Sequence, residues 1–139
     1  RPMSFDDLGF RELLDSYLEK VIKNKNINII FDKYTLNSNE QSILIFIFRV
    51  IKECISNSIK HSKCDEIHIS IDDSDEKNLY LQVIDNGTGF DVEEKNLEKN
   101  KHFGLIIIKE RVKLMQGDID IKSDKNGTRV KIIIPINNM

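Results

Sequence analysis

The spacing of apolar residues along the chain changes repeatedly between the period of a helix and that of a strand. Apolar residues three or four positions apart predict three helices, over about 10–23, 39–61 and 104–115. Alternating or short continuous apolar runs predict five strands, over about 27–31, 67–71, 79–84, 118–123 and 128–134. Together these elements predict an α+β fold: a two-layer α/β sandwich, with helices packed on one face of a mixed, mainly antiparallel sheet.

Short local signals mark the ends of these elements. Asn126-Gly127 lies between the last two strands and is a residue pair typical of a tight β-hairpin. Ser38 and Gln41 predict a capping box in front of the long helix. Residues 1–10 have the pattern of a connection, and no linker divides the remainder, so we expect one domain over 11–139. Because the chain begins with arginine, we also expect it to be a piece of a longer protein.

Composition narrows the classes of function. The 139 residues carry a net charge of −2 with many charges of both signs, whereas non-specific nucleic-acid binding needs a basic excess. No apolar run has the length needed to span a bilayer, so we expect no membrane contact by this piece. Cys54 and Cys64 match no zinc pattern, and Cys54 lies on the apolar side of a predicted helix. We therefore expect Cys54 in the core and a reducing, cytoplasmic location.

The segment Asp85-Asn86-Gly87-Thr88-Gly89-Phe90-Asp91 follows a predicted buried strand. Glycine has no side chain, so Gly87 and Gly89 would allow the backbone to lie close against a flat ligand. A dinucleotide fingerprint would need a third glycine where Val92 stands, and the chain contains no Gly-Lys-Ser/Thr step of a P-loop. The alternative is a plain turn that leaves an edge strand.

Polar residues four positions apart, Glu53, Asn57 and His61, form a stripe along the long predicted helix. Such a stripe is commonly a solvated helix face. It also suits a magnesium–nucleotide site, because Mg²⁺ prefers oxygen ligands and keeps several waters, so the Asn57 amide could hold it. Glu53 could orient a water or accept a proton, and Lys60 and His61 could meet phosphate oxygens.

Two further segments suit the same ligand. His102-Phe103-Gly104-Leu105 opens the third helix, where exposed amides and the helix dipole favour an anion and a glycine allows close approach. Thr128 follows Gly127 and could place a hydroxyl near a base, although the pair also serves the hairpin turn. Residues 93–101 are almost all charged or polar, so we expect this segment to be solvated.

The order and spacing of these segments resemble the ATP-binding domain of bacterial sensor histidine kinases, which has the Bergerat (GHKL) ATPase fold. Residues 53–61 resemble the N box of that family and residues 85–91 its first glycine box. Residues 103–105 resemble the second glycine box of the DegS-like and nitrate-sensor branch, and residues 127–130 the closing Gly-Thr. The resemblance covers nearly the whole chain.

The resemblance implies a role for each matching residue. Asp85 would accept a hydrogen bond from the adenine amino group, and Gly87 and Gly89 would shape the adenine pocket. Asn57 would hold Mg²⁺, and Glu53 would act beside the transferred phosphoryl group as the catalytic residue.

The second glycine box would bind the phosphates. Phe103, Gly104 and Leu105 would flank them, and residues 92–102 would form a lid over ATP. The box in this family often carries an earlier glycine, and Asn100-Lys101-His102 stands in its place here. Lid flexibility would then depend on polar residues.

The implied function is a histidine kinase catalytic domain that binds Mg-ATP. It would pass the γ-phosphoryl group to a histidine on an upstream dimerisation domain of the same protein, and a response regulator would receive it afterwards. No match to the phosphoacceptor segment is present in these residues. Two alternatives stay open: a stand-alone serine kinase of the anti-sigma type, and a non-catalytic docking module with a decayed pocket.

Overall fold

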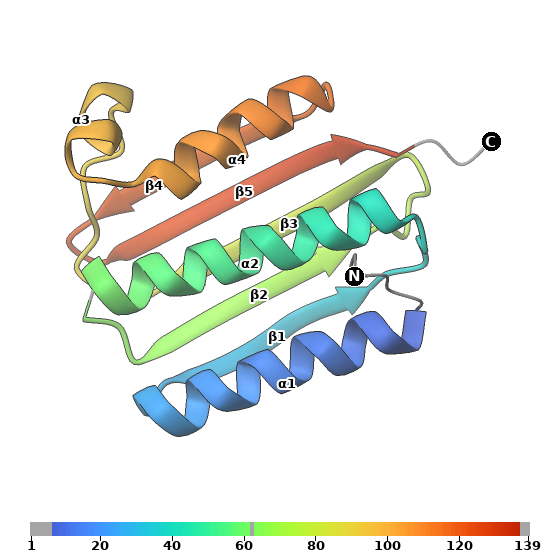
Figure 1. Cartoon of the computed structure of the whole chain (residues 1–139), viewed down its shortest axis with the longest axis horizontal. Coiled ribbons are helices and arrows are strands. Elements are labelled where there is room, and N and C mark those ends of the chain that lie inside the picture. Colours follow the sequence, from blue (N-terminus) through green and yellow to red (C-terminus); the bar gives the residue numbers. More distant parts are fainter. Residues whose placement is uncertain (1–6, 62, 137–139) are drawn as a thin grey trace, which may run out of the picture.

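The computed structural model describes residues 7–61 and 63–136, apart from the side chains of residues 7, 8, 61 and 94 (Figure 1). Its elements are α1 (Asp7–Lys25), β1 (Asn28–Thr35), α2 (Gln41–His61), β2 (Glu66–Asp72), β3 (Asn78–Asp85), α3 (Glu94–Lys99), α4 (Phe103–Leu114), β4 (Asp118–Asp124) and β5 (Gly127–Pro135). The three predicted helices and five predicted strands are all present, with ends that differ by a few residues.

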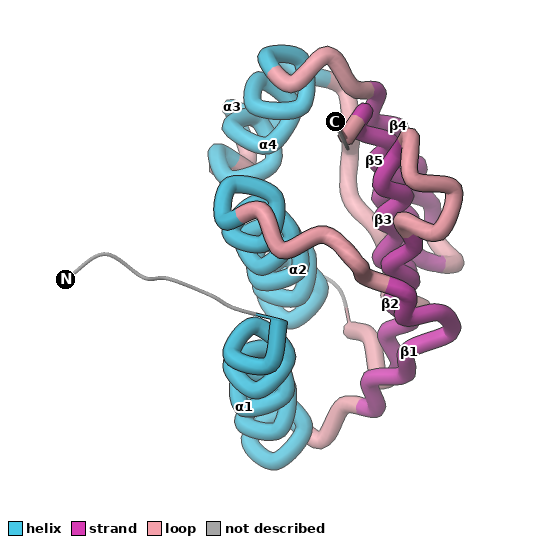
Figure 2. Tube along the Cα trace, turned by 90° about the vertical axis from the view of Figure 1, so that its right-hand side faces the viewer, coloured by secondary structure: helices cyan, strands magenta, loops and turns pink. Residues whose placement is uncertain are grey.

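The five strands form one sheet in the order β1-β2-β3-β5-β4. Strand β1 runs parallel to β2, and the other neighbouring pairs are antiparallel. The helices all lie on one side of this sheet (Figure 2), which confirms the predicted two-layer arrangement. Strand β3 is central, and its last residue, Asp85, is flanked by Ile67 of β2 and Thr128 of β5.

The core lies between the helices and the inner face of the sheet. Ile67, Ile69 and Ile71 alternate along β2 and are fully buried, as the period of a strand requires. Ile47 and Ile51 of α2 are also fully buried and lie one helical turn apart. Each such side chain contributes roughly 1.5–3 kcal/mol relative to an exposed position, so the α2–sheet contact anchors the fold.

The entry to α2 is held by a contact that the predicted capping box does not include. The Ser38 hydroxyl accepts a hydrogen bond from the Glu40 amide at 3.4 Å, and the helix begins only at Gln41. The contact comes from Asp73, a buried carboxylate from the β2–β3 turn, which accepts hydrogen bonds from the Asn37 and Ser38 amides at 2.8 Å each. A carboxylate is a stronger acceptor than a hydroxyl, so a long-range contact fixes this entry to the helix.

Helix α1 begins at Asp7, three residues before the predicted start, and residues 1–6 of the predicted connection lie outside the described residues. Strand β1 likewise extends to Thr35. A contact that joins the two elements accounts for part of this. The Arg11 guanidinium lies 4.1 Å from the centre of the Tyr34 ring and 4.9 Å from that of Phe31, a cation–π arrangement.

The polar segment after β3 is not wholly solvated, contrary to the prediction. It contains the short helix α3, which packs beside α4, and Leu97 within it is fully buried. His102, at the end of the segment, is only 3% exposed. A single leucine in a charged segment is enough to hold that segment against the core.

On the outer face of the sheet, His68 lies between two carboxylates. Its Nδ1 is 2.8 Å from Asp32 Oδ1 of β1, and its Nε2 is 2.5 Å from Glu66 Oε1. The hydrogen bond to Asp32, followed by that to Glu66, raises the pKa of His68 above its ordinary value. The ring faces water, as expected, but it also links β1 to β2.

We predict that this link stabilises the fold mainly at low pH. Because the folded-state pKa of His68 is raised, its contribution is complete below the unfolded pKa of about 6.5 and is lost as pH rises through the folded-state pKa. His68→Gln should therefore lower the free energy of unfolding most on the acidic side, as measured by urea denaturation at a series of pH values. Ser70→Ala is the matched control on the same strand, and a His68→Gln effect that grows with pH would contradict the assignment.

Candidate functional site

The end of β3 presents a buried carboxylate in a fixed position. Asp85 Oδ1 accepts hydrogen bonds from the Gly87 amide at 2.9 Å and the Thr128 amide at 3.2 Å. The Ser58 hydroxyl donates to Asp85 Oδ2 at 2.5 Å. A carboxylate has about four acceptor positions, so these three donors leave about one for a ligand. The side chain is 6% exposed, so its orientation is set by the protein.

A small cavity, here called the base cavity, lies against this carboxylate. Its lining comes from α2, β3, β5, α4 and one loop: Cys54, Asn57, Ser58, Val83, Asp85, Phe90, Leu105, Thr128 and Val130. Four of the residues predicted for the site meet here: Asn57, Asp85, Leu105 and Thr128. Its volume is about 10 Å³, which is enough for about one water molecule.

Asn57 adds an unsatisfied polar group to the base cavity. The side chain is 7% exposed, and its Nδ2 has no hydrogen-bond partner within the described part of the chain. A buried amide left without a partner costs about 1–3 kcal/mol. The amide therefore indicates that a water molecule or a ligand completes this site.

Glu53 and Gly104 are in direct contact at the start of α4. A Cβ placed on Gly104 would overlap the Glu53 carboxylate, so glycine allows this close approach and a larger residue would displace that side chain. The first amides of a helix have no intrahelical partner, and the helix dipole adds positive potential there. The half-buried Glu53 carboxylate thus lies beside a ready-made anion site at the N-terminus of α4.

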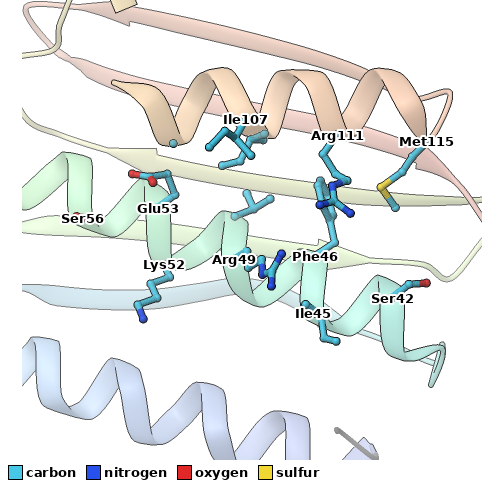
Figure 3. A pocket seen from close by; sticks show the side chains of 13 residues that line it. Ser42, Ile45, Phe46, Arg49, Lys52, Glu53, Ser56, Ile107, Arg111 and Met115 are labelled. Carbon is cyan, nitrogen blue, oxygen red and sulfur yellow. The ribbon is translucent and has the colours of Figure 1, made fainter. Parts of the chain in front are cut away.

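A second and larger cavity of about 740 Å³, here called the α2–α4 groove, runs between the two helices (Figure 3). Glu53 and Gly104 line one end of it, and Ser42 and Met115 the other. Most of the remaining surface of the groove is apolar, although Arg49 and Arg111 also line it. The other lining residues are Ile45, Phe46, Val50, Lys52, Ser56, Ile107 and Ile108. Asp85 and Asn57 do not line the groove, so it is distinct from the base cavity. Of the described polar side chains predicted for the site on α2, only Glu53 lines the groove.

The other predicted site residues differ in burial and position. Gly87 is buried and contributes its amide to Asp85. Lys60 is exposed and lines neither cavity. Phe103 is 52% exposed and also lines neither. The side chain of His61 lies outside the described residues.

Two serines that the sequence did not single out complete the site. Ser123 Oγ accepts a hydrogen bond from the Phe90 amide at 2.8 Å and lies 2.7 Å from Thr128 Oγ1. Gly89, with φ of +76°, brings the chain so close to Asp124 and Ser123 that a Cβ there would overlap both. Ser58 could have been found as a polar residue on the apolar side of a helix, whereas Ser123 has no local signal.

Cys54 lines the base cavity but does not supply a nucleophile. Burial, followed by the negative charges of Glu53 and Asp85, raises the pKa of its thiol well above the ordinary value. The thiol therefore stays protonated at neutral pH, and the prediction of Cys54 as a core residue is confirmed.

Residues 43–138 match the protein family described as histidine kinase-, DNA gyrase B-, and HSP90-like ATPase. The chain belongs to this ATPase family. It is 36% identical to the signal transduction histidine-protein kinase/phosphatase DegS of Bacillus subtilis over 98% of its own residues, and it spans 36% of the length of DegS. It is also 46% identical to the sensor histidine kinase YdfH of the same organism, over 64% of this chain and 22% of YdfH.

Solved structures agree with this ATPase fold. The Acinetobacter baumannii histidine kinase AdeS superposes with a TM-score of 0.73 at 19% identity, over 98% of this chain and 68% of that one. A histidine kinase domain from Erythrobacter litoralis gives 0.71 at 17% identity, over 97% of this chain and 65% of that one. At these identities the likeness shows the fold alone. No helix among the described residues has the length and apolarity needed to cross a membrane.

Domains of this family bind ATP, and the donors and acceptors around the base cavity fit that ligand. Asp85 keeps an acceptor position, the Asn57 amide lacks a partner, and the first turn of α4 can receive an anion. The volume of the base cavity does not yet fit a purine. The polar groups that would bind the ligand are in position, but the cavity beside them is smaller than the base.

We predict that Gly104→Ala uncouples stability from ATP binding. Alanine favours the helix by about 1 kcal/mol relative to glycine, so the free energy of unfolding should not fall. The new methyl group should displace the Glu53 carboxylate and weaken ATP binding at least about tenfold, measured by calorimetry. In the double variant with Glu53→Ala the clash is absent, so part of the affinity should return. Strictly additive losses would contradict the contact.

Proposed function

We propose that this domain binds Mg-ATP in an opened form of the base cavity and donates the γ-phosphoryl group to a histidine on a dimerisation domain of the same protein. The observation that carries the proposal is the Asp85 carboxylate, held by three donors beside the unpartnered Asn57 amide. Such a constellation suits a ligand with one hydrogen-bond donor on a flat base and phosphates nearby. A cytoplasmic location would follow, because ATP is drawn from the cytoplasm.

Base selection follows from the chemistry of a carboxylate. The amino group of adenine can donate to the remaining acceptor position of Asp85, whereas guanine presents a carbonyl oxygen at the same place and would be repelled. Gly87 donates its amide to the same carboxylate, so the loop and the acceptor keep their relative positions. The Thr128 amide also donates to Asp85 Oδ1, and the Thr128 hydroxyl is hydrogen-bonded to Ser123 Oγ.

The phosphates would extend from the base cavity toward the N-terminus of α4. Its first amides, from Phe103 to Leu105, would bind phosphate oxygens, with Gly104 allowing close approach. Lys60 and His61, at the end of α2, would supply positive charge. Asn57 would hold Mg²⁺ through its amide oxygen, and the ion when bound would neutralise phosphate charge.

Glu53 is the residue of this chain that we place at the reacting atoms. An imidazole nitrogen of the acceptor histidine would form a bond to the γ-phosphorus as the bond to the β–γ bridging oxygen breaks and ADP leaves. The Glu53 carboxylate would orient the imidazole and accept the proton that its ring releases. The rest of the work of the protein is positioning and charge stabilisation.

The α2–α4 groove offers a path for the acceptor. It begins at Glu53 and continues between two helices as an apolar surface, on which Ile107 is 59% exposed (Figure 3). A helix that carries the acceptor histidine could lay its apolar stripe there and bring the imidazole to Glu53. A response regulator would then take the phosphoryl group from that histidine.

A non-catalytic docking module is the second candidate, and the small volume of the base cavity is the observation that favours it. In that case the domain would act only through surfaces such as the α2–α4 groove. Nucleotide binding separates the two functions directly.

We predict that the domain binds ATP in calorimetric titration and prefers ATP to GTP. Asp85→Asn replaces part of the acceptor by a donor, so it should weaken ATP binding at least about tenfold and reduce the preference for adenine. Asp118→Asn, exposed on β4 and outside the lining of both cavities, is the matched control and should bind as the unmodified domain does.

The same titrations, carried out with and without Mg²⁺, test the role of Asn57. Asn57→Ala should leave ATP binding nearly the same with and without Mg²⁺, whereas the unmodified domain should bind more tightly with it. Absence of binding at millimolar ATP in the unmodified domain would favour the docking module.

We predict that the α2–α4 groove is needed for transfer and not for ATP binding. Ile107→Glu puts a charge on an apolar contact surface, so autophosphorylation of the full-length protein should fall about tenfold while ATP affinity in the domain is unchanged. Lys113→Glu, exposed on α4 but outside the groove, is the matched control. Equal autophosphorylation in both variants would remove the groove from the proposal.

A further inference from the structure

We infer that the stacked rings of Phe90 and His102 form a gate that closes the base cavity, and that ATP binds only after this ring pair separates. The inference rests on the proposed function, because it concerns the same cavity. It assigns to His102 a positioning role that acts through Phe90.

The volume of the base cavity shows that a closed state exists. About 10 Å³ accommodates about one water molecule, whereas adenine is a bicyclic ring system of ten heavy atoms with its amino group. The acceptor on Asp85 and the amide of Asn57 are nonetheless already in position. The polar groups for a base are therefore present in a cavity that the base cannot enter.

Only one wall of the base cavity is suited to move. Eight of the nine lining residues lie within α2, β3, α4 or β5, where backbone hydrogen bonds and core packing hold them. Phe90 is the exception, because it lies in the loop after β3. The Phe90 amide is held by its hydrogen bond to Ser123 Oγ at 2.8 Å, so the part of this residue that can move is its ring. Movement of the Phe90 ring is therefore the least costly way to enlarge the cavity.

His102 holds the Phe90 ring in the closed position. The two ring centres are 4.5 Å apart with 22° between their planes, an arrangement typical of stacked aromatic rings. His102 is 3% exposed, and its backbone amide donates to the Leu97 carbonyl at 2.7 Å. Since Leu97 is fully buried, the lid segment, residues 92–102, is packed against the core in this structure, in which the rings are stacked. Parting of the rings would thus couple base entry to release of the lid.

A gate of this kind lowers the apparent affinity for ATP. The apparent dissociation constant equals the intrinsic one divided by the fraction of molecules that are open, because only the open form binds. Removal of the His102 ring takes away the stacking contact but leaves Asp85, Asn57 and Glu53 untouched. His102→Ala should therefore bind ATP more tightly, which is the opposite of the loss expected for a residue that contacts the nucleotide.

Opening can be measured without nucleotide, through Cys54, which lines the base cavity and is 5% exposed. In a Cys64→Ser background, the rate at which a thiol reagent, 5,5′-dithiobis(2-nitrobenzoic acid), labels Cys54 reports opening. His102→Ala should raise this rate about threefold or more, and His102→Phe, which keeps a ring, should restore the original rate. Glu98→Ala, exposed in the lid, is the control.

Urea denaturation of the same variants separates gating from loss of stability. A labelling rate that changes only as much as the free energy of global unfolding predicts would overturn the gate, as would equal rates in the unmodified protein and His102→Ala. The ring-retaining His102→Phe variant keeps the test decisive if alanine destabilises the lid.

Nucleotide kinetics provide the second readout. With a fluorescent N-methylanthraniloyl-ATP and Mg²⁺, the observed binding rate of the unmodified protein should level off with concentration, because opening becomes limiting, while that of His102→Ala should continue to rise. A plateau of the observed binding rate at the same value in the unmodified protein and in His102→Ala would overturn the gate. If no variant binds nucleotide while Cys54 labelling still responds to His102→Ala, the proposed function fails and the gate stands.

Discussion

The site depends on one constraint: the carboxylate of Asp85 is held by donors from three different parts of the chain. The Ser58 hydroxyl comes from α2, the Gly87 amide from the loop after β3 and the Thr128 amide from β5. These contacts join the helical layer to the centre of the sheet at a place where a buried carboxylate would otherwise lack compensation. They also determine which acceptor position stays available, so in the proposed function the contacts that stabilise the fold here would also select for an amino group.

The sheet and the helices contribute differently to the two cavities. The sheet and α2 supply most of the walls of the base cavity, and α2 and α4 supply the groove that meets this site at Glu53. Gly104 is the point of contact between the two helices, because its missing side chain allows the Glu53 carboxylate to reach the first turn of α4. In the proposed function, nucleotide chemistry and partner contact would share the Glu53 carboxylate. In the proposed gate, the Phe90 ring moves while its backbone amide stays bonded to Ser123 of the sheet.

Much of this arrangement could be predicted from the residues alone, for identifiable reasons. Helical spacing places Glu53 and Asn57 on one face, and the end of a buried strand places Asp85 near the edge of the sheet, so local periodicity carries that information. Local pattern could not predict Ser123, whose contact with Phe90 depends on the register of the β4–β5 hairpin against a distant loop. For the same reason it could not predict the Asp73 contact at the entry to α2, which comes from another turn, or the burial of Leu97. The volume of the base cavity depends on tertiary packing throughout.

The most direct measurement of the central claim is a crystal structure of the domain with a non-hydrolysable ATP analogue and Mg²⁺. The account predicts the adenine amino group within hydrogen-bond distance of Asp85 Oδ2, the phosphates at the first turn of α4, and the Phe90 ring displaced from His102. An analogue bound in the α2–α4 groove, or one that leaves Asp85 without contact to the base, would contradict it.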